Sequence, residues 1–348
     1  MNEQSAPADA RPAVAVALMA GLCGAVQPKI NAVLGERVGS TLIASLVNFA
    51  AALIVVVVVL VLRPGTRRML RQLPSWPVPP WTLTAGLGGA LIVVAGALAV
   101  ETIGVAIFSV AFFAGQISFG VLVDRFGVGP GGRRPVTPAR MQAALIAVVA
   151  VFVSQVGRPV GEFAPALVAF VVAAGAAFAF QSAFNGRIAA ATGDAFAATA
   201  VNVTVGIAAL AAIVTAVALA GHVDAPRWPR QPWLYAGGIL GVTVVLSLAI
   251  ATPALGVLWA TLVMLAAQLI TAFGVDWVAD HEAPTPGVIA GAFLVGGYLG
   301  YAVAQLGVGD PASATRLWRS CLAAVGAGLV MGAALLLELA CRVPRRPE

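Results

Sequence analysis

Long apolar runs dominate the pattern of hydrophobic and polar positions along the chain. Each run approaches the length of about 20 mostly apolar residues that a transmembrane helix needs, and short segments rich in Gly, Pro and Arg separate the runs. On this template the sequence predicts eleven membrane-spanning helices. They cover residues 13–34, 41–62, 82–100, 103–123, 139–156, 166–188, 196–219, 233–251, 254–274, 287–306 and 317–341. The two longer connections, 63–80 and 124–138, are predicted to be surface loops.

Composition supports a membrane protein and excludes several other classes. Hydrophobic residues make up 60% of the chain and charged residues 10%, and the mean hydropathy is +0.97. A water-soluble fold would have too little polar surface to cover itself. The net charge of +6 comes from arginines in loops between apolar runs, so we expect contact with lipid head groups and no nucleic-acid partner. The first ten residues lack Lys and Arg, so we expect the first run to be a retained helix and not a cleaved signal peptide.

Polar and glycine residues recur at nearly constant spacing. An offset of 154 aligns Gln27 with Gln181, Asn31 with Asn185, Gly39 with Gly193 and Asn48 with Asn202. An offset of 152 aligns Gly104 with Gly256, Gln116 with Gln268 and Asp124 with Asp276. Because such polar residues are scarce in apolar runs, the agreement indicates an internal repeat. The chain is predicted to comprise an N-terminal tail (1–12), two five-helix repeats (13–157 and 158–307) and a C-terminal segment (308–348) with an eleventh helix.

An odd number of helices in each repeat has a consequence for topology. The second repeat must enter the membrane from the side opposite to the first. Loop 63–80 carries four arginines and segment 124–138 three, whereas the segment that matches the latter carries Asp276, Asp280 and Glu282. By the positive-inside rule the arginine-rich loops and the N-terminus are cytoplasmic. The predicted fold is therefore an all-α membrane protein of two inverted five-helix repeats plus the C-terminal helix, in the inner membrane.

The motifs of the two halves resemble a known family. Each half opens with Gln-x-x-x-Asn ("QPKIN" and "QSAFN") and later carries "GQISFGVLVDRFG" or "AQLITAFGVDWVA". Over residues 13–307 the chain is similar to the YdcZ-type branch of the drug/metabolite transporter superfamily. The resemblance implies a ten-helix, inverted-repeat transporter, here with both halves in one chain and with an undefined substrate. The chain departs from that pattern in its extra C-terminal helix and at Glu101, which stands where the second half has Pro253.

The amides within the apolar runs are the candidate substrate site. Gln27 and Asn31 are four residues apart and therefore share a helix face, as do Gln181 and Asn185. An unsatisfied amide in hydrocarbon is costly, so each pair should face the protein interior. There the amides either bind substrate near the membrane midplane or form hydrogen bonds between helices. The predicted substrate-binding set also includes one asparagine from each second helix: Gln27, Asn31, Asn48, Gln181, Asn185 and Asn202.

A second set of polar residues is predicted to take part in gating or coupling. It comprises Lys29, Glu101, Gln116, Asp124, Gln268 and Asp276. Lys29, the only lysine, either extends to the outer head groups or lines an outer vestibule that attracts anions. Glu101 is placed in a turn. The two aspartates are placed at helix ends, where interfacial solvation or helix capping is the alternative to a role in transport.

Enzymatic motifs are missing from the sequence. It contains no Walker sequence, Gly-x-Ser-x-Gly motif or His and Cys residues at metal-ligand spacing, so we expect no cofactor, no metal and no ATP-driven pump. The prediction is a secondary transporter of a small organic molecule that works by alternating access. The alternatives are an exporter of hydrophobic or cationic drugs and, from another class, a structural or partner-binding membrane protein. The expected partners are the substrate and the bilayer, and the sequence leaves a homo-oligomer open.

Overall fold

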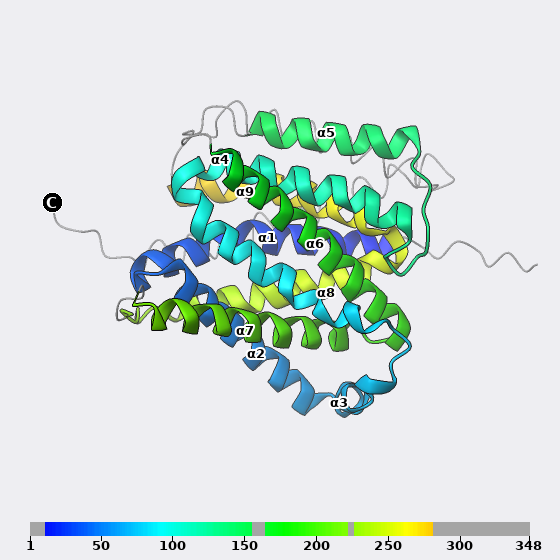
Figure 1. Cartoon of the computed structure of the whole chain (residues 1–348), viewed down its shortest axis with the longest axis horizontal. Helices are drawn as coiled ribbons and strands as arrows, with labels where there is room; N and C mark the ends of the chain where they lie inside the picture. Colours follow the sequence, from blue (N-terminus) through cyan, green and yellow to red (C-terminus); the bar gives the residue numbers. More distant parts are fainter. Residues whose placement is uncertain (1–10, 155–163, 222–225, 281–348) are drawn as a thin grey trace, which may run out of the picture.

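The computed structural model of the chain describes residues 11–154, 164–221 and 226–280, and every regular element in these ranges is a helix (Figure 1). The α-helices are α1 (Arg11–Val38), α2 (Thr41–Leu62), α3 (Pro64–Arg71), α4 (Gly86–Phe126), α5 (Pro138–Ser154), α6 (Pro165–Thr192), α7 (Ala195–Leu219), α8 (Gly237–Leu255) and α9 (Val257–Asp280). Three short 3₁₀ helices are η1 (Leu73–Ser75), η2 (Pro80–Ala85) and η3 (Pro232–Ala236). The predicted spans 287–306 and 317–341 lie outside the described residues.

Apolar helices of membrane-spanning length make up most of the described part. Seven stretches in it are long and apolar enough to cross a bilayer, and α5 and α9 contain shorter apolar runs. Large apolar side chains face outward on these helices, including Ile54, Leu145 and Leu219. Such a surface suits hydrocarbon and not water. The all-helical class and a multi-pass membrane protein are thereby confirmed.

Two glycines break helices at equivalent positions. The predicted spans 82–100 and 103–123 correspond to the two arms of α4, which meet at a kink where Gly104 has a non-helical backbone (φ 75°, ψ 158°). In the second half Gly256 has nearly the same conformation (φ 83°, ψ 168°) and separates α8 from α9. Positive φ is strained for residues with a side chain, which explains glycine at both places. The prediction that Glu101 lies in a turn was wrong, because the helical run of α4 continues past it to the break.

Segment 63–80 lies largely at the surface, as predicted, but it is folded and not a loop. It contains α3 and η1, and its Trp76 is buried in a small cluster with Ile188 and Ala197, from the end of α6 and the start of α7. The indole nitrogen of Trp76 also donates a hydrogen bond to the carbonyl oxygen of Met69, at 3.0 Å. The apolar residues of this segment are therefore used to cover the α6–α7 turn.

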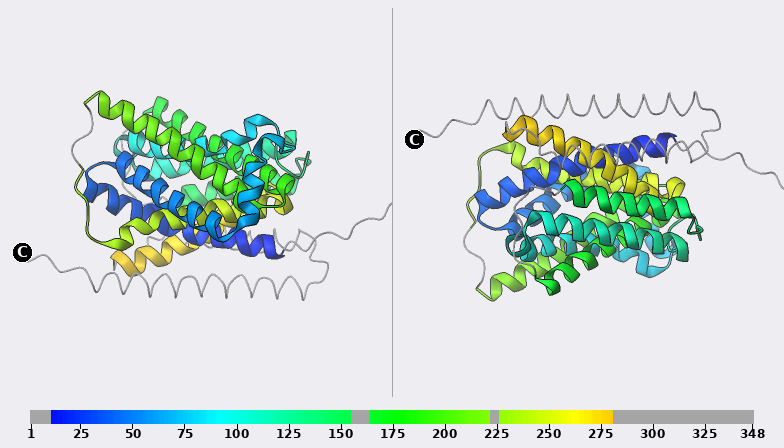
Figure 2. Two further views of the ribbon diagram at one scale, coloured as in Figure 1. Left: turned by 90° about the horizontal axis from the view of Figure 1, so that it is seen from below. Right: turned by 90° about the horizontal axis from the view of Figure 1, so that it is seen from above.

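Each half packs its first helix against the other half. Helices α1 and α6 run in opposite directions (Figure 1). Helix α1 packs against α8 and α9, and α6 packs against α4. Figure 2 shows α9, in orange and yellow, lying along α1, in blue. The first helix of either half thus has most of its partners in the half to which it does not belong.

Two equivalent glycines allow these close helix crossings. A Cβ atom on Gly21 of α1 would collide with the backbone of α9 at Met264 and Gln268. A Cβ atom on Gly175 of α6 would collide in the same way with the backbone of α4, at Phe112 and Gln116. Gly21 and Gly175 are 154 positions apart, the spacing of the predicted repeat. Small residues at helix crossings let backbones approach closely, and this is a main source of packing energy in membranes.

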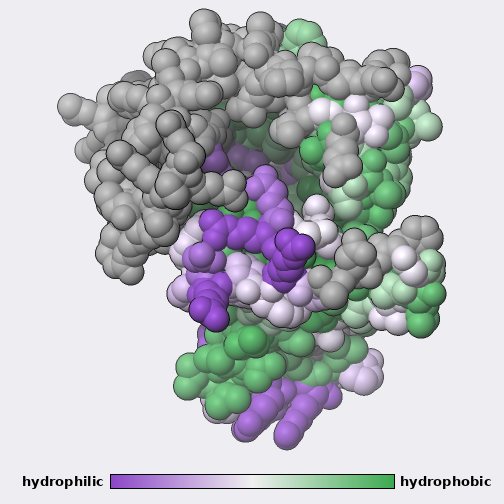
Figure 3. Space-filling view, turned by 90° about the vertical axis from the view of Figure 1, so that its left-hand side faces the viewer, coloured by the Kyte–Doolittle hydropathy of each residue, from purple (hydrophilic) through white to green (hydrophobic). Residues whose placement is uncertain are grey.

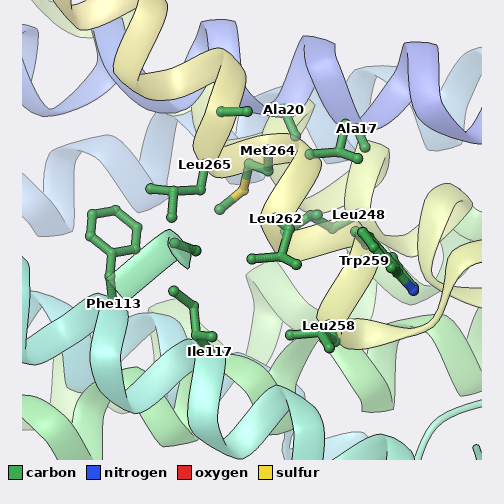
Figure 4. Packing of buried hydrophobic residues seen from close by; sticks show 14 of the residues in the cluster. Ala17, Ala20, Phe113, Ile117, Leu248, Leu258, Trp259, Leu262, Met264 and Leu265 are labelled. Atoms are coloured by element: carbon green, nitrogen blue, oxygen red, sulfur yellow. The ribbon is translucent and has the colours of Figure 1, made fainter. Parts of the chain in front are cut away.

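The largest apolar cluster surrounds α9. Figure 4 shows Met264 and Leu265 of α9 between Ala20 of α1 and Phe113 of α4, with Leu262 and Leu258 nearby. Leu258 and Leu265 are completely buried. Because α9 contacts α1 on one side and α4 on the other, this core joins the second half to two helices of the first.

Charged groups of the first half cap the broken helices α8 and α9. The buried carboxylate of Asp124 accepts hydrogen bonds from the first two amides of α9, those of Val257 (2.9 Å) and Leu258 (3.2 Å), and pairs with Arg140. Arg134 donates to the last carbonyls of α8, at 2.9 Å for Leu255. A carboxylate at a helix N-terminus and a guanidinium at a C-terminus both complement the helix dipole. Of the two expected structural roles of Asp124, capping is thus correct and interfacial solvation wrong.

The glycine crossing can be tested by adding a side chain. Gly21→Leu should lower the melting temperature in detergent by about 1–4 °C, because overpacking costs about 1–3 kcal/mol and the added Cβ itself meets the α9 backbone. Gly96→Leu is the matched control, since Gly96 also lies within a long apolar helix but has open space around its Cα. Equal melting temperatures of the two variants would show that α1 and α9 do not pack tightly at Gly21.

The cap can be tested by removing its charge. Asp124→Asn keeps the shape of the side chain but leaves Arg134 and Arg140 without their carboxylate, and breaking a buried pair costs about 3–5 kcal/mol. We expect the melting temperature to fall by about 4–7 °C. Glu36→Gln removes the same charge from an exposed position on α1 and should melt like the unmodified protein. If the cap did not stabilise the fold, both variants would melt at the same temperature as the unmodified protein.

Candidate functional site

The four predicted asparagines form two equivalent pairs. Asn48 of α2 donates a hydrogen bond through Nδ2 to Oδ1 of Asn31 on α1. Asn202 of α7 donates in the same way to Oδ1 of Asn185 on α6, at 3.4 Å. Each bond joins the first and second helices of one half, which is the interhelical role that the sequence left open. Gly237 of α8 lies over the first pair, and a Cβ atom there would collide with both amide oxygens.

The two predicted glutamines reach across to the other half. The amide nitrogen of Gln27 on α1 lies 2.7 Å from where a Cβ atom of Gly241 on α8 would be. The amide oxygen of Gln181 on α6 lies 3.4 Å from the same position on Gly89 of α4. Gln27 and Gln181 are 154 residues apart, and Gly89 and Gly241 are 152 apart. Each glutamine therefore occupies the space left by a missing side chain on the partner half.

The two glutamines are equivalent in contacts but differ in exposure. Gln181 is 3% exposed, and its Oε1 has no hydrogen-bond partner. Gln27 is half-buried, and so is Asn31, whereas Asn185 is only 1% exposed. An unsatisfied buried amide oxygen costs about 1–3 kcal/mol. Gln181 is thus poised to accept a hydrogen bond from a donor that enters this position.

Gln116 and Gln268 lie at the interfaces between the halves. Gln116 is fully buried on α4 and donates to the hydroxyl of Thr261 on α9, at 3.5 Å, while its own Oε1 has no partner. Gln268 of α9 is half-buried, and its Oε1 lies 3.4 Å from where a Cβ atom of Gly24 on α1 would be. Each of these two amides therefore lies between a helix of the first half and a helix of the second half.

Four predicted residues remain, namely Lys29, Asp124, Glu101 and Asp276. Lys29 is half-buried next to the exposed Pro28, and α1 continues as a helix through both. Asp124 belongs to the cap at the α8–α9 break, where burial lowers the pKa of its neighbour Arg134 and the carboxylate opposes that shift. Glu101 and Asp276 are within α4 and α9, but their side chains lie outside what the structure describes.

Sequence reasoning missed the partners of the polar residues. Gly89 and Gly241, which face the glutamines, could have been identified from the sequence, because they recur at the offset of 152. The contact between Arg134 and the end of α8 joins residues about 120 positions apart, and no local pattern in the sequence indicates it.

Comparisons with known proteins agree with this architecture. The family described as "Putative inner membrane exporter, YdcZ" matches residues 12–153 and 166–302, one stretch in each half. No relative was found among curated proteins. Seventeen chains of solved structures are similar. One, described only as "Crystal structure of protein", has a TM-score of 0.63 and 17% identity, and the match covers 85% of this chain and 97% of that one. At that identity the likeness supports the fold alone. Because the family match spans well over half of the sequence, the chain belongs to the YdcZ family of inner membrane transport proteins.

Proposed function

We propose that the protein exports a small organic molecule by alternating access between two inverted five-helix halves. The observation that carries the proposal is the pair of equivalent but unequally exposed glutamines, Gln27 over Gly241 and Gln181 over Gly89. A transporter built from inverted repeats places its substrate between them, and the halves exchange conformations to open one side or the other. Export is the direction named in the family description.

Several contacts support an inverted relation of the halves. Besides the opposite directions of α1 and α6, a further pair of glycines makes equivalent crossings. A Cβ atom on Gly86 of α4 would collide with the α7 backbone at Asn202, and one on Gly238 of α8 would collide with the α2 backbone at Asn48. The two family matches, one in each half, are also what such a duplication produces.

The difference in exposure supports a two-state mechanism. Gln27 and Gln181 each lie about 2.5 residues past the middle of their helices, or about 4 Å at 1.5 Å per residue. Because α1 and α6 run in opposite directions, the two amides lie on opposite sides of the midplane. The half-buried Gln27 and the buried Gln181 then correspond to one side open and one side closed. If the environments of Gln27 and Gln181 were exchanged, a molecule bound between them would be carried across the membrane.

The open side is opposite the end that is rich in arginine. Figure 3 faces the end toward which Gln27 is displaced and shows hydrophilic atoms near its middle, next to apolar ones. Helix α3, with three of the four arginines of segment 63–71, is at the other end (Figure 1). By the positive-inside rule the arginine-rich end is cytoplasmic. We therefore assign the described conformation as outward-open, with the N-terminus in the cytoplasm.

The chemistry of the site indicates the class of substrate. A neutral amide both donates and accepts hydrogen bonds, so the glutamines suit a polar uncharged group. The asparagine pairs already bond to each other and hold α1 and α6 in register with α2 and α7. We propose that the glutamines contact the substrate and that Asn31, Asn48, Asn185 and Asn202 position them.

Removal of either amide tests the site. Gln27→Leu and Gln181→Leu keep the bulk of the side chain but lose the hydrogen bond, so affinity should fall about tenfold, as a loss of about 1.4 kcal/mol requires. The probe is the strongest ligand from a thermal-shift screen of metabolites and drugs on the purified wild-type protein. Gln116→Leu is the matched control: it removes a buried amide that bonds between helices, and should melt earlier but bind normally. If the Gln27 and Gln181 variants behave like this control, these amides hold helices together and the site lies elsewhere.

Cysteine labelling tests the inversion. Arg67 and Arg230 both lie in connections that follow the second helix of their halves, after α2 and after α7. In a background without native cysteine, Arg67→Cys should react with an impermeant maleimide only from the cytoplasm, and Arg230→Cys only from outside. Labelling of both positions from the same side of intact cells would rule out inverted halves.

A further inference from the structure

We infer that the arginine face of α3 binds the head groups of anionic phospholipids in the cytoplasmic leaflet, and that this contact strengthens the junction of the two halves at that end. The inference concerns a surface that is separate from the glutamine site. It rests on the side-chain distribution of α3, on its depth relative to α2 and on its attachment to the second half.

Helix α3 is amphipathic over its whole length. At about 100° per residue, Arg67, Arg68 and Arg71 lie within an arc of about 100°, and all three are exposed. Thr66, which is buried, and Met69 and Leu70, which are half-buried, lie on the opposite arc and pack against the protein. A basic face opposite an apolar face is typical of helices that lie in the membrane interface.

The position of α3 along the chain sets its depth in the membrane. The last turn of α2 exposes Val61 (66%) and Leu62 (72%), which suits contact with lipid chains. Arg63 follows directly and α3 begins at Pro64, so the arginines lie where hydrocarbon gives way to head groups. Figure 1 shows α3 at the edge of the bundle and beyond the end of α2. This location favours a lipid over a soluble phosphate, because arginines exposed at an edge of the bundle offer a free anion no enclosure.

The charges of α3 lack acidic partners in the described part of the chain. The ion pair found there joins Arg140 to Asp124, and Arg63, Arg67, Arg68 and Arg71 take part in none. Arginine forks bind phosphate oxygens two at a time. Each basic residue near an anionic surface adds about 1 kcal/mol, equivalent to about fivefold in affinity.

A hydrogen bond connects α3 to the second half. The hydroxyl of Thr66 donates to Oδ2 of Asp194, at 2.7 Å, while Oδ1 of the same carboxylate caps α7 through Phe196 and Ala197. Holding α3 against the bilayer therefore also holds α2 of the first half to the start of α7. Bound lipid should stabilise the folded protein through this link.

The test measures melting of the purified full chain in detergent micelles doped with dioleoyl phosphatidylglycerol. This lipid should raise the melting temperature, whereas dioleoyl phosphatidylcholine and free glycerol phosphate should not. The triple variant Arg67→Gln, Arg68→Gln and Arg71→Gln should need at least about tenfold more phosphatidylglycerol for the same shift, given about fivefold per arginine. The matched control, Arg227→Gln with Arg230→Gln, changes exposed arginines at the opposite end and should respond like wild type.

Two further variants separate lipid binding from folding. Replacing the same three arginines by lysine keeps the charges and should retain most of the response, even if the glutamine variant folds poorly. Thr66→Val should keep the number of bound lipids seen by native mass spectrometry but show a smaller rise in melting temperature. An unchanged response of the glutamine variant, an equal effect of glycerol phosphate or an equal loss in the Arg227 and Arg230 control would each overturn the inference. A full response of Thr66→Val would overturn the link to the second half.

Discussion

A polar group inside a bilayer has to find its partner within the protein, because hydrocarbon offers none. The described residues meet this constraint in several ways. Asparagines bond to each other between adjacent helices, and the backbone groups released at Gly256 are satisfied by Asp124 and Arg134. A few buried polar atoms of the described residues have no hydrogen-bond partner, among them Oε1 of Gln116 and Oε1 of Gln181. The proposed substrate contact would supply a partner for the oxygen of Gln181, which lies next to Gly89 of the other half.

Close approach of helices is the second element of the design, and it depends on glycine. The crossings at Gly21 and Gly175 bring backbones together, and Gly89 and Gly241 make room for an amide. The equivalence is not complete, since Gly237 of α8 corresponds to Ala85, and Gly24 of α1 corresponds to Phe178 of α6. The two sides are therefore lined by different residues, and the difference also runs the other way, since Gly88 of α4, next to Gln181, corresponds to Leu240 of α8. This difference accompanies the greater exposure of Gln27 relative to Gln181.

Much of the architecture could be predicted from sequence because bilayer thickness imposes a length that apolar runs reveal. Span 41–62 agrees with α2 at both ends, and the offsets of 154 and 152 identify residues that make equivalent contacts. Properties that depend on three-dimensional proximity were not accessible. The charge of Asp124 indicated a helix end, but the helix that it caps begins 133 positions later, at Val257. Segment 63–80 has the Gly, Pro and Arg content of a loop, and only the surface of α6 and α7 beneath it explains why it folds.

The exchange of first helices between the halves has a consequence for biosynthesis. When α6 emerges, its partner α4 has already been made, so it can pack at once. Helix α1 is in the opposite situation, because α8 and α9 follow it by about 200 residues. Until then Gln27 must remain in the membrane without α8, which lies against its amide, although Asn31 can already bond to Asn48 of α2. The amide of Gln27 therefore waits for its cover through most of the synthesis, whereas that of Gln181 meets α4 as soon as α6 is made.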